Sequence, residues 1–68
     1  MKIEYDREVD VAYIYLKYPI KDGESKKTVR LDENISLDYD SSGLLLGIEI
    51  LNASKVLNKQ LIREAVPA

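Results

Sequence analysis

The sequence predicts an α+β fold in which an antiparallel sheet of four to five strands, joined as hairpins in a meander, is followed by a C-terminal helix packed on one face. Two observations lead to this prediction. In several short segments between residues 3 and 51, most clearly 35–40 and 44–50, apolar residues recur at every second position, which is typical of strands with one dry face. From Asn52 onward they recur every three to four positions, which indicates an amphipathic helix. The 68 residues are predicted to form a single small domain.

The first three strands are short and lie between polar turns. Residues 3–5 alternate in polarity, and residues 11–17, with the sequence VAYIYLK, are rich in β-branched and aromatic side chains. Pro19 ends the second strand because proline has no amide hydrogen to donate. After a polar loop over residues 19–27, residues 28–31 are predicted to form the third strand.

Residues 35–40 and 44–51 are predicted to form a hairpin whose loop has the sequence DSSG. Asp40 suits the start of a type I turn, and Gly43 tolerates a positive φ. A four-residue loop places apolar residues opposite each other, whereas a three-residue loop places a glycine and a glutamate opposite a leucine and an isoleucine. We therefore expect the four-residue loop, with the pairs Tyr39–Leu44, Leu37–Leu46 and Ile35–Ile48.

The same segment also matches the spacing of a calcium-binding EF-hand loop. The residues at loop positions one, three, five, six and twelve are Asp38, Asp40, Ser42, Gly43 and Glu49. An EF-hand needs a helix on each side, but here both flanks alternate as strands do. In the predicted hairpin Glu49 also lies about 13 Å from Asp38, too far for one ion. We expect no EF-hand, and only Asp38 and Asp40 stay as weak candidates for binding a surface cation.

The C-terminal helix is expected to begin near Asn52, since Asn52 and Ser54 are both suitable N-cap residues. Pro67 lies beyond its end. Whether the helix is continuous through Asn58 is an open question at this stage. Its apolar side consists of Ala53, Val56, Leu57, Leu61, Ile62, Ala65 and Val66.

The composition excludes several classes of function. The chain has no cysteine and no histidine, so it has no disulfide, no thiolate metal site and no histidine base. A net charge of −2, with one short basic cluster at Lys26, Lys27 and Arg30, is a poor match to nucleic acid. The apolar runs are too short to cross a membrane, and the N-terminal residues have no signal-peptide core, so a cytoplasmic location is expected. No cofactor is expected.

The two faces of the predicted sheet differ, and one helix covers only one of them. The helix is expected on the face that carries Ala12, Ile14, Leu16, Leu37, Leu46, Ile48 and Ile50. The opposite face is too apolar to be fully exposed to solvent, and Gly47, which has no side chain, leaves a flat spot on it. Tyrosine is enriched at interfaces, so we expect the chain to self-associate through this face or through a strand edge, most simply as a two-fold homodimer. Its predicted interface residues are Val11, Tyr13, Tyr15, Leu45 and Leu51.

Enzymatic chemistry has little support in the sequence. The serines have no neighbouring base other than carboxylate or lysine, and a single small sheet offers little concavity for a pair of catalytic carboxylates. The leading hypothesis is therefore a non-enzymatic protein-interaction module. The alternative is a small ligand- or cation-binding protein that uses surface carboxylates. These carboxylates belong to Asp38, Asp40 and the N-terminal acids Glu4, Asp6, Glu8 and Asp10.

Three segments resemble those of a known family. The chain starts MKIEYD, its hairpin reads DYDSSGLLLGIEIL, and a short ASKVL segment follows. In these segments the sequence resembles the short prokaryotic domain-of-unknown-function family 2283, over nearly the whole chain up to Leu57. The resemblance implies no substrate and no catalytic signature. Some relatives are thought to be encoded beside small toxin-like proteins, so it also implies a small protein partner and an antitoxin-like role.

Overall fold

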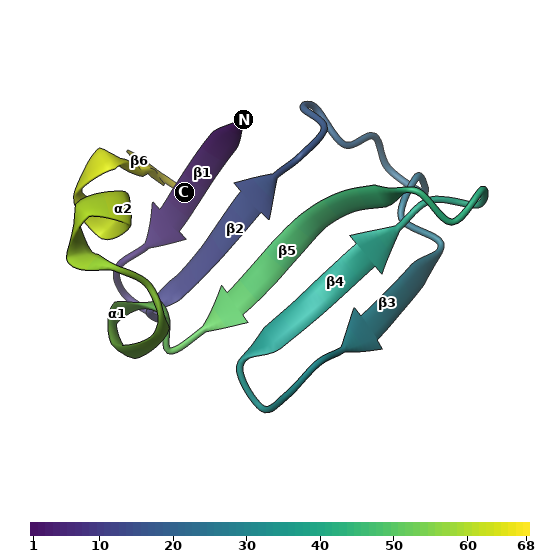
Figure 1. Cartoon of the computed structure of the whole chain (residues 1–68). Helices are drawn as coiled ribbons and strands as arrows, with labels where there is room; N and C mark the ends of the chain where they lie inside the picture. The colour runs from purple at the N-terminus through teal and green to yellow at the C-terminus, as the bar shows by residue number, and fades with distance from the viewer.

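The computed structural model describes all residues from Met1 to Ala68 and shows a six-stranded sheet with two short helices at one end (Figure 1). The strand order is β3-β4-β5-β2-β1-β6, and all neighbours are antiparallel except β1 and β6. The predicted α+β class and antiparallel sheet are confirmed, with one strand more than expected. The strands are β1 (Lys2–Asp6), β2 (Val11–Tyr15), β3 (Lys27–Arg30), β4 (Ile35–Tyr39), β5 (Leu45–Leu51) and β6 (Val66–Pro67).

The additional strand, β6, is formed by the last residues of the chain. It runs parallel to β1, with Glu4 beside Val66 and Tyr5 beside Pro67. The amide of Ala68 also donates to the carbonyl of Tyr5 at 3.1 Å. Two residues are too few to show an alternating pattern, so the sequence gives no sign of this strand.

The β4–β5 hairpin forms, but the predicted pairing of its strands is wrong. The amide of Asp40 donates to the carbonyl of Leu44 at 2.9 Å, so the loop contains three residues and not four. The Asp40 carboxylate accepts hydrogen bonds from the amides of Ser42 and Leu44, each at 2.9 Å, and Gly43 has a φ of 82°. These bonds fix the shorter loop, which starts the pairing one residue out of step with the prediction.

A bulge then shifts the pairing by one further residue. Asp38 pairs with Gly47 but Tyr39 pairs with Leu45, so Leu46 has no partner on β4. Because side chains alternate with period two, a total shift of two residues leaves the aliphatic residues on the face where they were predicted. The observed pairs are therefore again aliphatic, and they are Leu37–Ile48 and Ile35–Ile50.

The second strand is shorter than predicted, because β2 ends at Tyr15. The amides of Leu16 and Lys17 both donate to the carbonyl of Leu46, at 2.9 and 3.1 Å. Two consecutive amides that share one acceptor break the regular ladder, and the chain leaves the sheet there. Leu16, which was expected on the helix-covered side, is consequently 44% exposed.

The predicted single helix is instead two short helices, α1 (Ala53–Val56) and α2 (Lys59–Glu64). Leu57 between them has an extended backbone. Asn58 begins the second helix, because its side-chain oxygen accepts the amide hydrogen of Gln60 at 2.8 Å. Neither helix has the length or the apolar character that crossing a bilayer requires.

The first helix is capped by a distant residue. Asn52 occupies the N-cap position, as expected, but has a left-handed backbone and makes no capping bond. The Asp10 carboxylate, from the β1–β2 turn, accepts the amide of Ser54 at 2.9 Å and its hydroxyl at 2.7 Å. The hydroxyl of Tyr5 donates to the same carboxylate at 2.7 Å. Asp10 therefore ties the turn, the first strand and α1 together.

The core of the molecule is thin. Only six of the 68 residues are buried, and none of the large side chains is fully buried. A chain of 7.8 kDa typically exposes about 4,400 Å², whereas this one exposes 4863 Å². The central cluster is formed by Ala12, Ile50 and Ala53, against which Tyr5, Ile14, Ile48, Leu57 and Ile62 pack while partly exposed.

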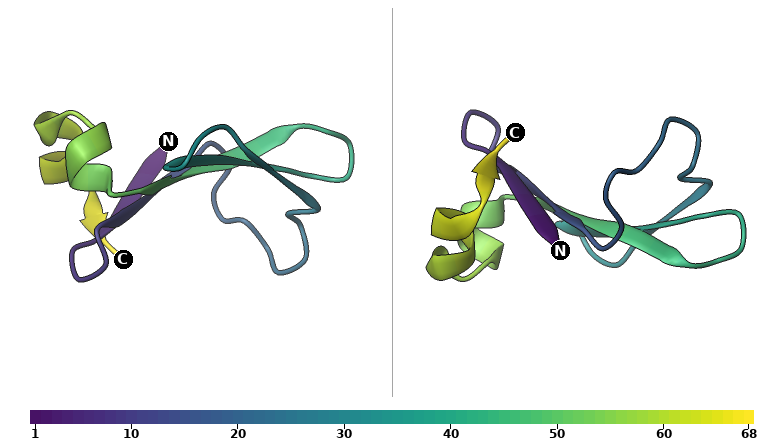
Figure 2. Two further views of the ribbon diagram at one scale, coloured as in Figure 1. Left: turned by 90° about the horizontal axis from the view of Figure 1, so that it is seen from below. Right: turned by 90° about the horizontal axis from the view of Figure 1, so that it is seen from above.

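The helices cover only one end of one sheet face. α1 lies against β5 and α2 lies against β1. No helix lies over β3 or β4 (Figure 1). The connection between β2 and β3 lies on the opposite side of the sheet from the helices (Figure 2). The sheet is therefore a single layer with part of each face uncovered.

Candidate functional site

The observed pairing gives the sheet two chemically different faces. We call the side that carries Tyr13, Tyr15 and Asp38 the tyrosine face, and the opposite side the aliphatic face. On the aliphatic face two apolar rows cross the strands, because directly paired residues point to the same side. One row is Ile3, Ile14, Ile48, Leu37 and Val29, and the next is Tyr5, Ala12, Ile50 and Ile35.

An aromatic chain crosses the tyrosine face. The rings of Tyr13 and Tyr15 meet edge to face with centroids 4.7 Å apart, and those of Tyr15 and Tyr18 do so at 5.1 Å. The ammonium group of Lys2 lies 4.0 Å from the centroid of the Tyr18 ring and is 2.9 Å from its hydroxyl. That hydrogen bond is the main cause that raises the pKa of Lys2. The rings are thus packed against one another within the chain.

The tyrosine hydroxyls are bound to carboxylates of the same chain. Tyr13 donates to Asp38 at 2.6 Å, and the hydroxyl of Thr28 donates to the other oxygen of Asp38 at 2.6 Å. Tyr15 donates to Glu4 at 2.8 Å, and this bond is the main cause that raises the pKa of Tyr15. The network links β1 to β3 across the width of the sheet and satisfies both hydroxyls internally.

Gly47 is occupied by one of these rings. A Cβ atom at Gly47 would lie 2.5 Å from the hydroxyl oxygen of Tyr13 and 2.6 Å from its nearest ring carbon. The Tyr13 ring therefore lies flat on the β5 backbone, where glycine alone leaves room. Burial raises the pKa of Tyr13 strongly, and the bond to Asp38 raises it further. The flat spot expected for another molecule is filled by the chain itself.

The structure brings four of the five predicted interface residues together. Val11 pairs directly with Leu51, and Tyr13 and Tyr15 follow on the same side of β2. Leu45 is separated from them, because it lies beyond the bulge, opposite Tyr39. Leu45 is 38% exposed.

The carboxylates proposed for cation binding do not converge. Asp38 accepts from two hydroxyls on the tyrosine face, whereas Asp40 accepts two amides inside the hairpin loop. Among the N-terminal acids, Glu4 bonds Tyr15 and Asp10 bonds the start of α1. No group of three or more acidic side chains is arranged so that it could hold a metal ion.

The aliphatic face contains a surface that the sequence did not distinguish. Beyond the reach of the helices, the side chains over β3 and β4 are uncovered, and we call them the bare aliphatic surface. One member, Leu37, was expected beneath one long helix, but the interruption at Asn58 leaves each helix too short to extend over this surface. Its members are Val29, Ile35, Leu37 and Tyr39, which are half-buried, and Leu31, which is 60% exposed.

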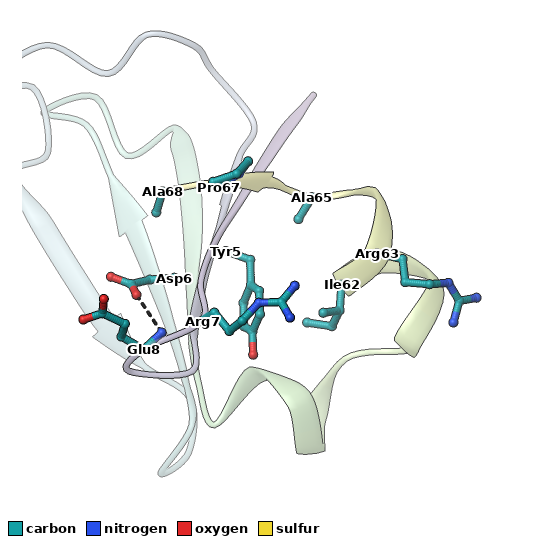
Figure 3. Close-up of a pocket in the computed structure, with 9 residues that line it drawn as sticks. All are labelled: Tyr5, Asp6, Arg7, Glu8, Ile62, Arg63, Ala65, Pro67 and Ala68. Atoms are coloured by element: carbon teal, nitrogen blue, oxygen red, sulfur yellow. Dashed lines mark hydrogen bonds between the residues drawn. The ribbon is translucent and has the colours of Figure 1, made fainter.

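A hollow of about 530 Å³ lies at the opposite end of the molecule, between the β1–β2 turn and the C-terminal segment. In Figure 3 the guanidinium group of Arg7 lies beside Tyr5 and Ile62, whereas the side chain of Arg63 extends away from them. An adjoining hollow of about 300 Å³ shares these four residues and is also lined by Ser54 and Lys59. No local pattern predicts this arrangement, because its parts are more than 50 residues apart in the chain.

Comparison with known proteins places most of the sheet within one family. The family described as "Protein of unknown function (DUF2283)" matches residues 2–54, which include β1 to β5 and the start of α1. The uncharacterized protein MJ0789 of Methanocaldococcus jannaschii is 49% identical over 59 residues, which are 85% of this chain and 46% of that protein. The chain thus spans about half the length of this curated relative. No solved structure matches the chain. Because this match covers most of the chain, the chain belongs to the DUF2283 family.

Proposed function

We propose that the protein is a small non-enzymatic interaction module that self-associates, with a second copy covering the bare aliphatic surface. The observation that supports this most is the thin core, with six buried residues and no large side chain fully buried. A domain of this size gains little stability from its own core, and a partner subunit is a common way to bury more apolar area.

The chemistry of the two faces favours the aliphatic one as the contact surface. On the tyrosine face, the rings of Tyr13, Tyr15 and Tyr18 pack on one another and their polar atoms bond within the chain. The bare aliphatic surface has no charged side chain in its two central rows and no covering element. Lys27, which pairs with Tyr39 and so shares this side, is exposed on the outer strand and can keep its ammonium group in solvent at the rim of such a contact.

The dimensions of the molecule fit a second copy. The chain is a plate of 33 × 24 × 18 Å, so its broad side offers about 800 Å² in projection. A stable protein–protein interface buries about 800 Å² on each partner. Because the bare aliphatic surface is only part of that broad side, a two-fold arrangement that sets one such surface on another reaches this area only where the flanking helices also contact the partner.

The test is sedimentation of purified protein at micromolar concentrations, with Leu31→Glu as the decisive variant. Leu31 is 60% exposed, so the charge does not disturb the fold but falls within the proposed contact. We expect the wild type to sediment as a dimer and Leu31→Glu to weaken dimerisation about tenfold or more, since a buried unpaired charge costs several kcal/mol. Val9→Glu is the matched control, because Val9 is 63% exposed in the β1–β2 turn.

Three results would contradict the proposal. One is a wild type that sediments as a 7.8 kDa monomer at about 100 μM, well above the dissociation constants of ordinary interfaces. Another is dissociation by Tyr15→Ser but not by Leu31→Glu, which would assign the contact to the tyrosine face. The third is a monomer that binds a different small protein through this surface, the arrangement of an antitoxin-like role.

A further inference from the structure

The second hollow at the helical end of the molecule combines cationic and apolar side chains. It is lined by Arg7, Lys59 and Arg63 around Tyr5 and Ile62. These residues come from three places, the β1–β2 turn, the first strand and α2. A hollow of about 300 Å³ corresponds to a small ligand and not to a protein segment.

None of the three cationic groups forms an ion pair within the chain. The ion pairs of the molecule are Lys2 with Glu4 and Lys17 with Glu24, both distant from this site. Two acidic residues flank Arg7 in sequence, Asp6 and Glu8, but they extend away from Ile62 and Arg63 (Figure 3). Asp6 instead accepts the amide of Glu8 at 3.0 Å. The carboxylate beside the hollow is that of Asp10, whose oxygens accept hydrogen bonds from Tyr5 and Ser54, so three cationic groups there face one carboxylate that is already bonded.

The base of the hollow is apolar and held in place. The Tyr5 hydroxyl is fixed by Asp10, which also holds the start of α1, so the ring cannot swing away without breaking that link. Ile62 packs against the core cluster from α2. A flat or aliphatic group that rests on Tyr5 and Ile62 places its charged end by the guanidinium group of Arg7, and the exposed side chain of Arg63 has to turn toward it to make a second contact.

We propose that this hollow binds a small organic oxyanion, a carboxylate or phosphate carried on a short apolar or aromatic body. The planar guanidinium forks of Arg7 and Arg63 match the paired oxygens of either group, and Lys59 adds a third positive charge. The apolar body lies on Tyr5 and Ile62. Because Lys59, Ile62 and Arg63 lie beyond residues 2–54, the site is completed by the segment that follows the family match.

The experiment is titration of the ¹⁵N-labelled full chain at low salt, followed by NMR. The probes are phenyl phosphate, benzoate, inorganic phosphate and uncharged benzyl alcohol. We expect phenyl phosphate or benzoate to shift the amide signals of Tyr5, Arg7, Ile62 and Arg63, and the tighter of the two identifies the preferred oxyanion. Inorganic phosphate should bind more weakly, because it lacks the apolar body, and benzyl alcohol should cause no shift.

Two variants, each of which removes one positive charge, distinguish binding at this site from attraction by the overall charge of the protein. Arg63→Gln should weaken the tighter probe at least about fivefold, as expected for loss of one partly exposed charged contact. Lys26→Gln, in the loop before β3 at the other end of the sheet, should leave affinity unchanged.

Several outcomes would overturn the proposal. They are shifts that lie outside the hollow, equal weakening by both variants, and equal binding of benzyl alcohol or of inorganic phosphate. Should Arg63→Gln fail to fold, the shift map of the wild type still decides between these outcomes. The association state of the chain does not affect this titration, because the hollow lies away from the bare aliphatic surface.

Discussion

At the scale of single residues, Tyr13 and Gly47 form a matched pair. A Cβ atom at Gly47 would lie 2.5 Å from the hydroxyl oxygen of Tyr13, so the ring occupies the space of a side chain at this position. The hydroxyl reaches Asp38 only because the ring lies directly on the β5 backbone. The sequence indicated that Gly47 leaves space on this face. It could not indicate that the space is filled from within the chain, because Tyr13 and Gly47 are on different strands and neither pairs directly with the other.

This pair yields a prediction for Gly47→Ala. The added methyl group must displace the Tyr13 ring, so we expect a loss of about 1–3 kcal/mol in the free energy of unfolding, as for other overpacked sites. In a Tyr13→Ala background the ring atoms that lie nearest to the methyl group are gone, and Gly47→Ala should cost less than about 0.5 kcal/mol. Urea denaturation at one fixed protein concentration measures both values. Equal costs in the two backgrounds would show that the ring does not occupy Gly47.

At the scale of elements, the hairpin shows what an alternating pattern can and cannot predict. Alternation places Ile35, Leu37 and Ile48 on one face, and this holds because the observed pairing differs from the expected one by two residues. Alternation alone does not specify the pairing itself. The pairing of β4 with β5 depends on the Asp40 carboxylate, which closes a three-residue loop, and on the bulge at Leu46. No local sequence pattern predicts the bulge.

The helical segment shows the same limit. Spacing of apolar residues indicated helix from Asn52 onward, but Asn58 competes with the helix by capping the next one. The cap of the first helix comes from Asp10, 44 residues before Ser54, and so depends on the folded arrangement. Of the candidate site, the sequence predicted that a contact face exists and proposed residues for it, but the bare aliphatic surface follows only from where the helices stop.

The Asp10 link predicts a dependence on pH. Hydrogen bonds from Tyr5 and then Ser54 lower the pKa of Asp10 in the folded chain. A lowered pKa stabilises the fold above the unfolded value, and this contribution is lost as pH falls through the folded pKa, that is, below about pH 4. We therefore expect Asp10→Asn to lower the melting temperature at pH 7 and to have a smaller effect at pH 3.

The control for that measurement is Asp22→Asn. Asp22 lies in the β2–β3 connection, and its side chain makes no hydrogen bond in the structure. Thermal unfolding followed by circular dichroism at both pH values should show no difference between Asp22→Asn and the wild type. The link would be disproved if Asp10→Asn melted at the wild-type temperature at pH 7.

At the scale of the whole molecule, a single sheet covered only at one end by two short helices is too thin to bury large side chains. Both the exposed area of 4863 Å² and the absence of any fully buried large residue follow from this geometry. The short extent of 18 Å allows one layer of sheet and one of helix, and the helical layer is incomplete. The stability of such a chain is expected to depend on what covers the remaining surface.

This dependence can be measured by melting the protein at different concentrations. If a second copy stabilises the folded chain, the melting temperature should rise by several degrees between about 5 and 200 μM, because association favours the folded state by mass action. Leu31→Glu should melt at a lower temperature that does not change with concentration. A wild type whose melting temperature is the same at all concentrations would show that the chain is stable alone.

The strand β6 has a consequence for how copies of the chain can accumulate. It shields the outer side of β1 with two residues, one of which, Pro67, has no amide hydrogen to offer a newcomer. The other margin of the sheet is β3, where Lys27 and Arg30 are exposed and would repel their counterparts on an identical ribbon. Both edges therefore disfavour the addition of further strands, so association through the bare aliphatic surface, as proposed above, is not expected to continue into fibrils.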